Sequence, residues 1–129
     1  MAKRQSLYTE SFSHSNPTPS ACRMGPLLMS GIINGIEKGR AAGTPTGSLE
    51  EQCELMFARV REVMALADGA LDQIVKVNVA FADVTQRTAA NVAWVALFPD
   101  ENNRPVRHST QTALDNGKLV QCDIVAWME

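Results

Sequence analysis

The chain has 129 residues, of which 45% are apolar and 20% are charged, and its formal net charge is −2. This length and composition predict one globular domain with a real hydrophobic core. The charge, and the lack of a run of Lys and Arg with interleaved aromatics, argue against nucleic acid as a partner. No apolar stretch approaches the roughly 20 residues of a membrane helix, so no membrane partner is expected.

The cysteines and histidines bear on compartment and metal content. Cys22, Cys53 and Cys122 are odd in number and far apart, which predicts reduced thiols rather than a disulfide framework. The N-terminus carries no apolar segment typical of a secretory signal, and we therefore expect a cytoplasmic location. The two histidines, His14 and His108, form no HxxxH, and no CxxC is present, so no metal site is expected.

The first third of the chain predicts short strands and loops. Residues 1–19 are polar and indicate a weak first strand followed by a loop. The apolar run 23–33 predicts a strand that starts near Leu27 and is interrupted around Ser30. Residues 34–47, rich in glycine and small side chains, predict a long loop.

The clearest element is a helix over residues 48–69. Ser48 and Glu51 have the spacing of a capping box, and Gly69 is the expected C-terminal stop. The apolar side chains at helical spacing predict one buried face, and the methionines among them are expected to fill the core rather than bind a ligand. This face consists of Leu49, Cys53, Met56, Phe57, Val60, Met64 and Ala67.

A strand and a second helix follow. Residues 71–83 alternate in the manner of a strand, with Val75, Val77, Val79 and Phe81 on one face. Residues 84–99 predict a helix with Asp83 or Thr85 as its cap and Pro99 as its end. The inner face predicted for this helix consists of Ala89, Val92, Ala93, Ala96 and Leu97.

The C-terminal third predicts two more strands. The runs 105–114 and 118–128 flank Asp115-Asn116-Gly117, and Asn-Gly between two strand-like runs is a strong hairpin signal. We therefore expect these two strands to pair with each other.

The resulting element order, ββ-loop-α-β-α-β-β, predicts an α+β fold: a mixed sheet with two helices packed on one face. The last strand is apolar on both sides, with Val120 and Cys122 pointing one way and Val125 and Trp127 the other. Two helices can cover only one side of such a sheet. We therefore expect a second subunit to cover the other, which predicts a homo-oligomer.

The segment RPVRHST carries the first candidate site residue. Residues two apart on a strand share a face, so Arg107, Ser109 and Gln111 should point together. The planar guanidinium of Arg107 matches a carboxylate ligand, but an ion pair with an Asp or Glu of the chain would explain it equally well. His108 points to the opposite face and is interpreted as structural.

Several motifs, in this order, resemble the RidA family (YjgF/YER057c/UK114, often labelled "endoribonuclease L-PSP"). They are M29-S30-G31, the capped helix, DQIVKVNVAFAD, Asn91 in NVAWVALFP, RPVRHST and LVQCDIVAW. The similarity covers nearly the whole chain and implies one domain over residues 16–129, after an N-terminal strand or extension over 1–15. It implies a chorismate-mutase-like fold and a homotrimer with clefts between subunits.

The resemblance also implies an activity: hydrolysis of a small carboxylate-bearing enamine or imine to a keto acid and ammonia, without metal or organic cofactor. In this view Arg107 grips the substrate carboxylate, and the backbone of Ser30 and Gly31 contacts the ligand. Asn91 lies near the cleft. Ser109 stands where many members carry a cysteine or a small polar residue. The Ser30-Gly31 pair could also offer free N–H groups to an anion, although such pairs are common in turns.

Two positions depart from the family pattern. Deaminating members typically read V-E-I-E in the last strand, and this chain reads V120-Q121-C122-D123. Gln121 can orient a water but cannot act as a base, and Asp123 shares its face. Members typically carry G-P-Y in the early loop, where this chain has Thr18 in place of the tyrosine. Both departures favour a specialised, for example catabolic, substrate.

The departures leave three readings open. The first is the imine or enamine hydrolase, with Arg107 and Gln121 as its catalytic residues. The second is a small-carboxylate-binding or chaperone-like trimer without chemistry, which the glutamine favours. The third is the nuclease of the family label, for which the sequence offers no carboxylate cluster, histidine pair or basic track.

Overall fold

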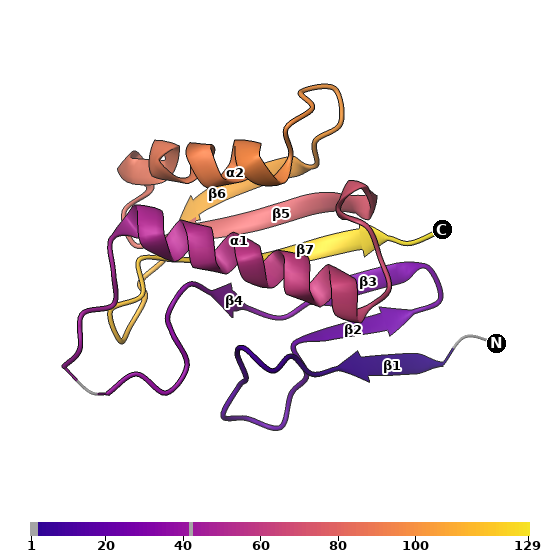
Figure 1. Ribbon diagram of the computed structural model, residues 1–129, viewed down its shortest axis with the longest axis horizontal. Helices are drawn as coiled ribbons and strands as arrows, with labels where there is room; N and C mark the ends of the chain where they lie inside the picture. The colour runs from indigo at the N-terminus through magenta and orange to yellow at the C-terminus, as the bar shows by residue number, and fades with distance from the viewer. Residues whose placement is uncertain (1–2, 42) are drawn as a thin grey trace.

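A computed structural model describes residues 3–41 and 43–129 of the chain (Figure 1). Its elements, in chain order, are β1 (Arg4–Leu7), β2 (Ala21–Met24), β3 (Leu27–Ser30), β4 (Ile33–Asn34), α1 (Leu49–Leu66), the 3₁₀ helix η1 (Leu71–Gln73), β5 (Ile74–Phe81), the 3₁₀ helix η2 (Val84–Ala90), α2 (Asn91–Leu97), β6 (Val106–Gln111) and β7 (Val120–Trp127).

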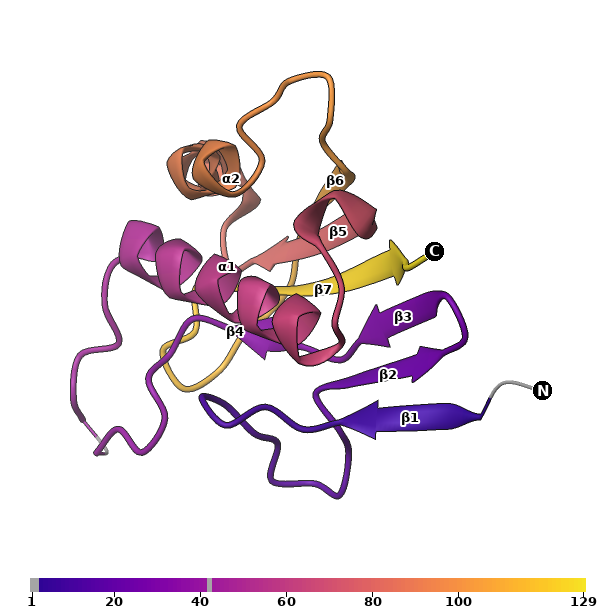
Figure 2. The ribbon, with the colours of Figure 1, turned by 45° about the vertical axis from the view of Figure 1, so that its right-hand side comes forward.

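The strands form one mixed sheet in the order β1-β2-β3-β7-β5-β6, with β4 pairing to β7 beside β3. Strands β5 and β6 run parallel, and the other neighbours run antiparallel. Figures 1 and 2 show α1 and α2 on the same face of this sheet. The predicted α+β class, a mixed sheet with two helices on one face, is confirmed.

Helix α1 begins as predicted. The Ser48 hydroxyl accepts the Glu51 N–H at 3.1 Å, and the Glu51 carboxylate accepts the Ser48 N–H at 2.9 Å. At the other end the left-handed residue is Asp68, with φ 59°, rather than Gly69. Gly69 serves a different purpose, because a Cβ there would lie 2.6 Å from the tip of Met128. The predicted apolar face of this helix is buried throughout.

The predicted C-terminal hairpin is wrong. Asn116 and Gly117 do adopt the positive φ of a tight turn, 55° and 78°. However, β6 and β7 are not neighbours, because β5 lies between them: Val79 pairs with Ser109 on one side and with Cys122 on the other. The turn depends only on its own residues. The pairing of β7 depends on the whole sheet, because β7 is a central strand with a neighbour on each of its two edges.

The first half of the sheet contains a strand that the sequence did not predict. β2 pairs with β1 on one side and with β3 on the other, through a turn at Gly25, which has φ 57°. β2 has only four residues, too few for a periodic signal, and Arg23 is the one charged residue among them.

Two predicted faces are right in most positions and wrong in a few: Val77, Val79 and Phe81 of β5 are buried as predicted, as is Leu97 of α2. In β5 the register shifts between Ile74 and Lys76, so Ile74 is buried and Val75 is 49% exposed, the reverse of the prediction. The second helix is 3₁₀ before it is α-helical, which changes the angle between successive residues. As a result Val92 is 85% exposed and Trp94 is buried.

The uncovered face of the sheet is partly apolar, as the last strand predicted. Leu27 pairs with Trp127 and Met29 with Val125 across β3 and β7. The Trp127 side chain is 48% exposed and that of Met29 is 53% exposed. We call the apolar side chains on this side of β3 and β7 the open-face patch: Leu27, Met29 and Trp127, which are exposed, and Val125, which is partly exposed.

Candidate functional site

Arg107 lies on β6, at the edge of the sheet, and points to the helix-covered face. Its register partner on β5 is Val77, which is fully buried on that face. The guanidinium Nη2 donates to Asn91 Oδ1 at 3.0 Å, and the guanidinium carbon lies 5.2 Å from the centre of the Trp94 ring. Stacking on an aromatic ring and one amide contact hold the planar fork in place without neutralising it.

No carboxylate of the described chain pairs with Arg107. The one salt bridge found within residues 3–41 and 43–129 joins Lys118 to Asp115. Burial lowers the pKa of the Arg107 guanidinium; the neighbouring Cys53 opposes this effect and Arg87 adds to it. The alternative of an ion pair within the subunit is therefore not observed, and the charge of Arg107 is left for another partner.

Asn91 is the first residue of α2, directly after the end of η2, and its side chain is exposed. Trp94 follows three residues later and therefore lies on the same side of the helix. The structure thus brings together two predicted site residues, Asn91 and Arg107, and adds Trp94, which was not among the predicted site residues. Its spacing from Asn91 was the signal that could have found it.

Ser30 and Gly31 close the end of β3. The Ser30 hydroxyl accepts the Ile124 N–H at 2.8 Å and donates to the Gly31 carbonyl at 2.8 Å. The Gly31 N–H donates to the Ser20 carbonyl at 2.9 Å. The suggestion that the Gly31 amide is free for an anion is therefore wrong for the single subunit. The open space over Gly31 remains, since a Cβ there would lie 3.7 Å from His14 Nε2, its nearest neighbour.

Thr18 and Ser109 occupy different surroundings. Thr18 lies in the exposed loop before β2, where its N–H donates to the Asn16 carbonyl at 2.8 Å. Ser109 lies on β6 opposite the buried Val79, so it shares the face of Arg107 as predicted. Gln111 shares this face too, because its amide oxygen accepts the Val84 N–H at 3.1 Å.

Gln121 points the other way. It pairs with Ala80 across β7 and β5, one row beyond the Asn78–Asp123 pair on the open face of the sheet. The Asp123 carboxylate accepts a hydrogen bond of 2.8 Å from the Asn78 side chain. Within one chain, the open face therefore carries Gln121 and Asp123, and the helix face carries Arg107.

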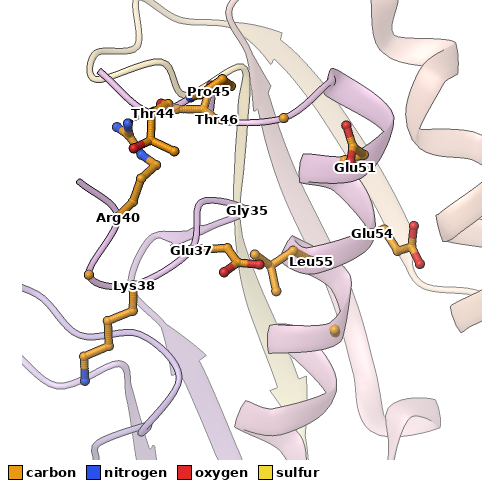
Figure 3. A pocket seen from close by; sticks show the side chains of 13 residues that line it. Gly35, Glu37, Lys38, Arg40, Thr44, Pro45, Thr46, Glu51, Glu54 and Leu55 are labelled. Atoms are coloured by element: carbon orange, nitrogen blue, oxygen red, sulfur yellow. Dashed lines mark hydrogen bonds between the residues drawn. The ribbon is translucent and has the colours of Figure 1, made fainter. Parts of the chain in front are cut away.

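Three cavities of the described residues lie away from these side chains. The largest of the three, about 710 Å³, lies between the loop after β4 and the outer side of α1 (Figure 3). A second, about 180 Å³, lies between α1 and α2, and a third, about 240 Å³, lies beside the N-terminal segment. None of the three is lined by Arg107, Asn91 or Gln121. The candidate residues thus form two groups on open surfaces of the single subunit.

The described residues contain neither a group of metal ligands nor a membrane-spanning helix. Across residues 3–41 and 43–129, no three His, Cys, Asp or Glu side chains are grouped so that they could hold a metal ion. No helix that the structure describes combines the length and the apolar character of a membrane span.

A family model described as Endoribonuclease L-PSP matches residues 20–128. The chain belongs to this family. The resemblance seen in the sequence motifs is therefore confirmed at family level, over most of the domain expected for residues 16–129.

Two curated relatives of this endoribonuclease L-PSP family member are fungal. "Protein mmf2, mitochondrial" of Schizosaccharomyces pombe is 25% identical over 94 residues, which are 73% of this chain and 72% of the relative. "Protein MMF1, mitochondrial" of Saccharomyces cerevisiae is 34% identical over 61 residues, 47% of this chain and 41% of the relative.

Solved structures share the fold of this family member. The crystal structure of yeast Mmf1 superposes with a TM-score of 0.83 at 19% identity, covering 98% of this chain and 100% of that one. RidA from the Antarctic bacterium Psychrobacter sp. PAMC 21119 gives 0.82 at 20% identity, with 96% and 99% covered. A YjgF/YER057c/UK114 member from Mycobacterium tuberculosis gives 0.80 at 18% identity, with 98% and 100% covered.

The cytoplasmic location expected from the sequence is wrong as stated. Both curated relatives are named as mitochondrial proteins, which conflicts with a purely cytoplasmic location. Cys22, Cys53 and Cys122 are free thiols, as expected. Free thiols are compatible with more than one compartment, so the cysteine argument could not distinguish between cytoplasm and mitochondrion.

Proposed function

We propose that the protein hydrolyses a small enamine or imine that carries a carboxylate, releasing a keto acid and ammonia, in clefts between the subunits of a homotrimer. The observation that carries this proposal is the guanidinium of Arg107. It is half-buried, oriented by Asn91 and Trp94, and lacks a carboxylate partner within the described chain. A preorganised and uncompensated fork is the protein group best suited to grip a substrate carboxylate.

The reaction then needs little more than positioning. An enamine first takes up a proton from solvent at its β-carbon and loses one from nitrogen, which gives the imine. Water then adds to the electrophilic carbon of the C=N bond: a C–O bond forms, the π electrons move to nitrogen, and one proton of the water passes to that nitrogen. The resulting carbinolamine transfers a proton from oxygen to nitrogen, the C–N bond breaks, and ammonia leaves with the electron pair. The protein holds the substrate by its carboxylate, and a neighbouring group orients the water. Placing the two reactants next to each other lowers the activation barrier, and no cofactor is required.

Gln121 is the group that we propose to orient the water. Its amide oxygen can accept one hydrogen bond from the water, and its NH₂ can donate to the developing hydroxyl. The amino group of the carbinolamine can itself take up the proton, so a carboxylate base is not indispensable. In this proposal the remainder of the binding site is shaped by Ser30, Gly31, Thr18 and Ser109. The small Thr18 and the Gln121 amide favour a specialised, for instance catabolic, substrate.

The homotrimer is part of the proposal. Trimers are typical of the family, and the open-face patch is an apolar surface that a second copy would cover. Because Arg107 and Gln121 lie on opposite faces of their own sheet, one cleft would combine Arg107 of one subunit with Gln121 of its neighbour.

A second candidate is a trimer that binds small carboxylates without turning them over, as a carrier or chaperone-like protein. Gln121 is the residue that favours it, because an amide cannot act as a general base near neutral pH. Arg107 would serve both functions equally well. Only a measurement of turnover separates the two.

The test couples the protein to an enzyme that generates imines in situ, an amino-acid oxidase or a serine/threonine dehydratase, and follows keto-acid release. Wild-type protein should accelerate the release over buffer. Arg107→Ala should abolish the acceleration, and Arg107→Lys should retain little of it, because an ammonium cannot form the bidentate pair.

The matched control is Arg104→Ala. Arg104 lies three residues earlier and donates to the carbonyls of Phe98 and Pro99 rather than facing Asn91. If no imine is hydrolysed faster than in buffer, while carboxylates still raise the melting temperature of the wild type but not of Arg107→Ala, the binding function replaces the enzymatic one.

A further inference from the structure

The third cavity, about 240 Å³, has an unusual charge. It lies between the N-terminal segment near Phe12, the loop after β4 and the turn before β7. Four cationic side chains, those of Lys38, Arg40, Arg59 and Lys118, line it, against one acidic side chain, Glu37. We propose that this cavity binds a small phosphate-bearing anion, at a site separate from Arg107.

The positive charges in this cavity are mostly uncompensated. Lys118 has a carboxylate partner, Asp115, at 3.4 Å, but that side chain is 80% exposed, and exposed pairs contribute little. Within the described chain, no carboxylate lies within salt-bridge distance of Lys38, Arg40 or Arg59. Four cations against one acid therefore leave the lining with an excess of positive charge.

Arg59 contributes most to this excess because it is buried. It is 3% exposed, and its guanidinium donates only to neutral oxygens: the Asn34 carbonyl and side chain at 3.0 Å and the Ser11 carbonyl at 3.1 Å. Its Nε–H is enclosed and has no partner. The nearby Glu62 carboxylate is instead bound by the N–H groups of Glu10 and Ser11. Glu62 and Glu37 favour the charge of Arg59, but neither lies within salt-bridge distance of it. A buried guanidinium without a paired carboxylate is costly, and an anion in the adjoining cavity would offset that cost.

Arg40 and Lys38 bring further donors on the loop. Arg40 holds the loop in place by donating to the Thr44 carbonyl at 2.6 Å and the Asn116 carbonyl at 3.1 Å, and its Nε–H also lacks a partner. Lys38 donates one hydrogen bond, to the Glu10 carbonyl at 3.2 Å, out of the three that an ammonium offers. Figure 3 shows the Glu37 side chain directed toward Leu55 of α1, while Lys38 points away from the helix.

The form of the cavity favours phosphate over a carboxylate. Its cations come from three different segments: the loop at 38–40, helix α1 at Arg59, and the turn at Lys118. Donors that converge from several directions suit a tetrahedral dianion, whereas a planar carboxylate carries one charge and is best matched by a single fork. The volume accommodates inorganic phosphate or pyrophosphate.

The test is titration calorimetry with inorganic phosphate, pyrophosphate and succinate at constant ionic strength, using the wild type and the variants Arg40→Gln, Lys118→Gln and Arg107→Gln. In the Arg107→Gln variant, which lacks the carboxylate site proposed at Arg107, phosphate and pyrophosphate should bind more tightly than succinate. Arg40→Gln and Lys118→Gln should each weaken that binding at least about tenfold, since each removes one charged donor. Arg107→Gln, the matched control, should leave it unchanged.

Arg40 and Lys118 lie on loops, so their variants are suitable for the test without replacing the buried Arg59. Circular dichroism verifies that each variant keeps its fold. The proposal is overturned if phosphate binds the Arg107→Gln variant no more tightly than succinate does, or if both loop variants bind phosphate as the wild type does. It is also overturned if Arg107→Gln abolishes the binding, since the phosphate would then occupy the site around Arg107.

Discussion

Arg107 and Gln121 project from opposite faces of one sheet. Arg107 pairs with Val77 and Gln121 with Ala80, and these two residues of β5 are separated by an odd number of positions. The two residues proposed to bind the substrate and to orient its water therefore cannot converge from the same chain without crossing the sheet.

Subunit mixing tests this relationship. Chains carrying Arg107→Ala and chains carrying Gln121→Ala should each form inactive trimers. When equal amounts are refolded together, about a quarter of the wild-type activity should return, because each cleft needs two intact residues from different chains and each is present about half the time. Each variant refolded alone is the control. A mixture as inactive as its components would place both residues in one subunit's site.

Replacing Gln121 by glutamate should create a general base. Keto-acid release by Gln121→Glu should be faster than in the wild type by about tenfold or more, since positioned acid–base groups typically contribute ~10²–10⁴-fold. The glutamate must be ionised to act, so the gain should be lost as the pH falls through its pKa. Gln111→Glu, on the helix face, is the matched control, and pH–rate profiles of both variants give the readout. Slower turnover by Gln121→Glu would contradict the proposed role of residue 121.

Alanine substitutions at Gly31 and Gly35 should have different effects, the first on activity and the second on stability. A Cβ on Gly35 would lie 1.9 Å from the Gln52 carbonyl oxygen, a backbone atom that cannot move aside, whereas a Cβ on Gly31 finds its nearest neighbour at 3.7 Å. Gly35→Ala should therefore lower the free energy of unfolding by about 3 kcal/mol or more.

Gly31→Ala should change the stability little, yet reduce imine hydrolysis if the substrate approaches this segment closely. Urea denaturation and the coupled assay measure the two effects. Full activity in a stable Gly31→Ala variant would remove Gly31 from the proposed binding site.

Helix α1 shows what the sequence could predict. Its capping box and its apolar face depend on side chains a few positions apart, and such local signals survive in the structure. The α+β class followed from the order of such elements. The pairing of Arg107 with Asn91, in contrast, joins residues from β6 and α2 and required the fold.

The errors arose where distant parts of the chain decide the outcome. Asn116-Gly117 makes its turn, yet β5 separates the strands on either side. A register shift at Ile74 moved only the first residue of the predicted β5 face out of the core, and a 3₁₀ segment before Asn91 left Val92 exposed. The buried polar residues Gln52 and Arg59 lie on the helix without a periodic signal, because their hydrogen-bond partners come from loops far away in the sequence.

The open-face patch should hold the proposed trimer together. Trp127 pairs with Leu27 across β7 and β3, and both side chains are exposed in the single subunit, at 48% and 38%. Trp127→Glu would place a charge where a second copy must exclude water, so light scattering should show a fall from trimer to monomer. The matched control is Val92→Glu, on the outer side of α2, where the side chain is 85% exposed. That variant should keep the mass of the wild type. A trimer that survives Trp127→Glu, or one that dissociates with Val92→Glu, would show that the subunits meet through another surface.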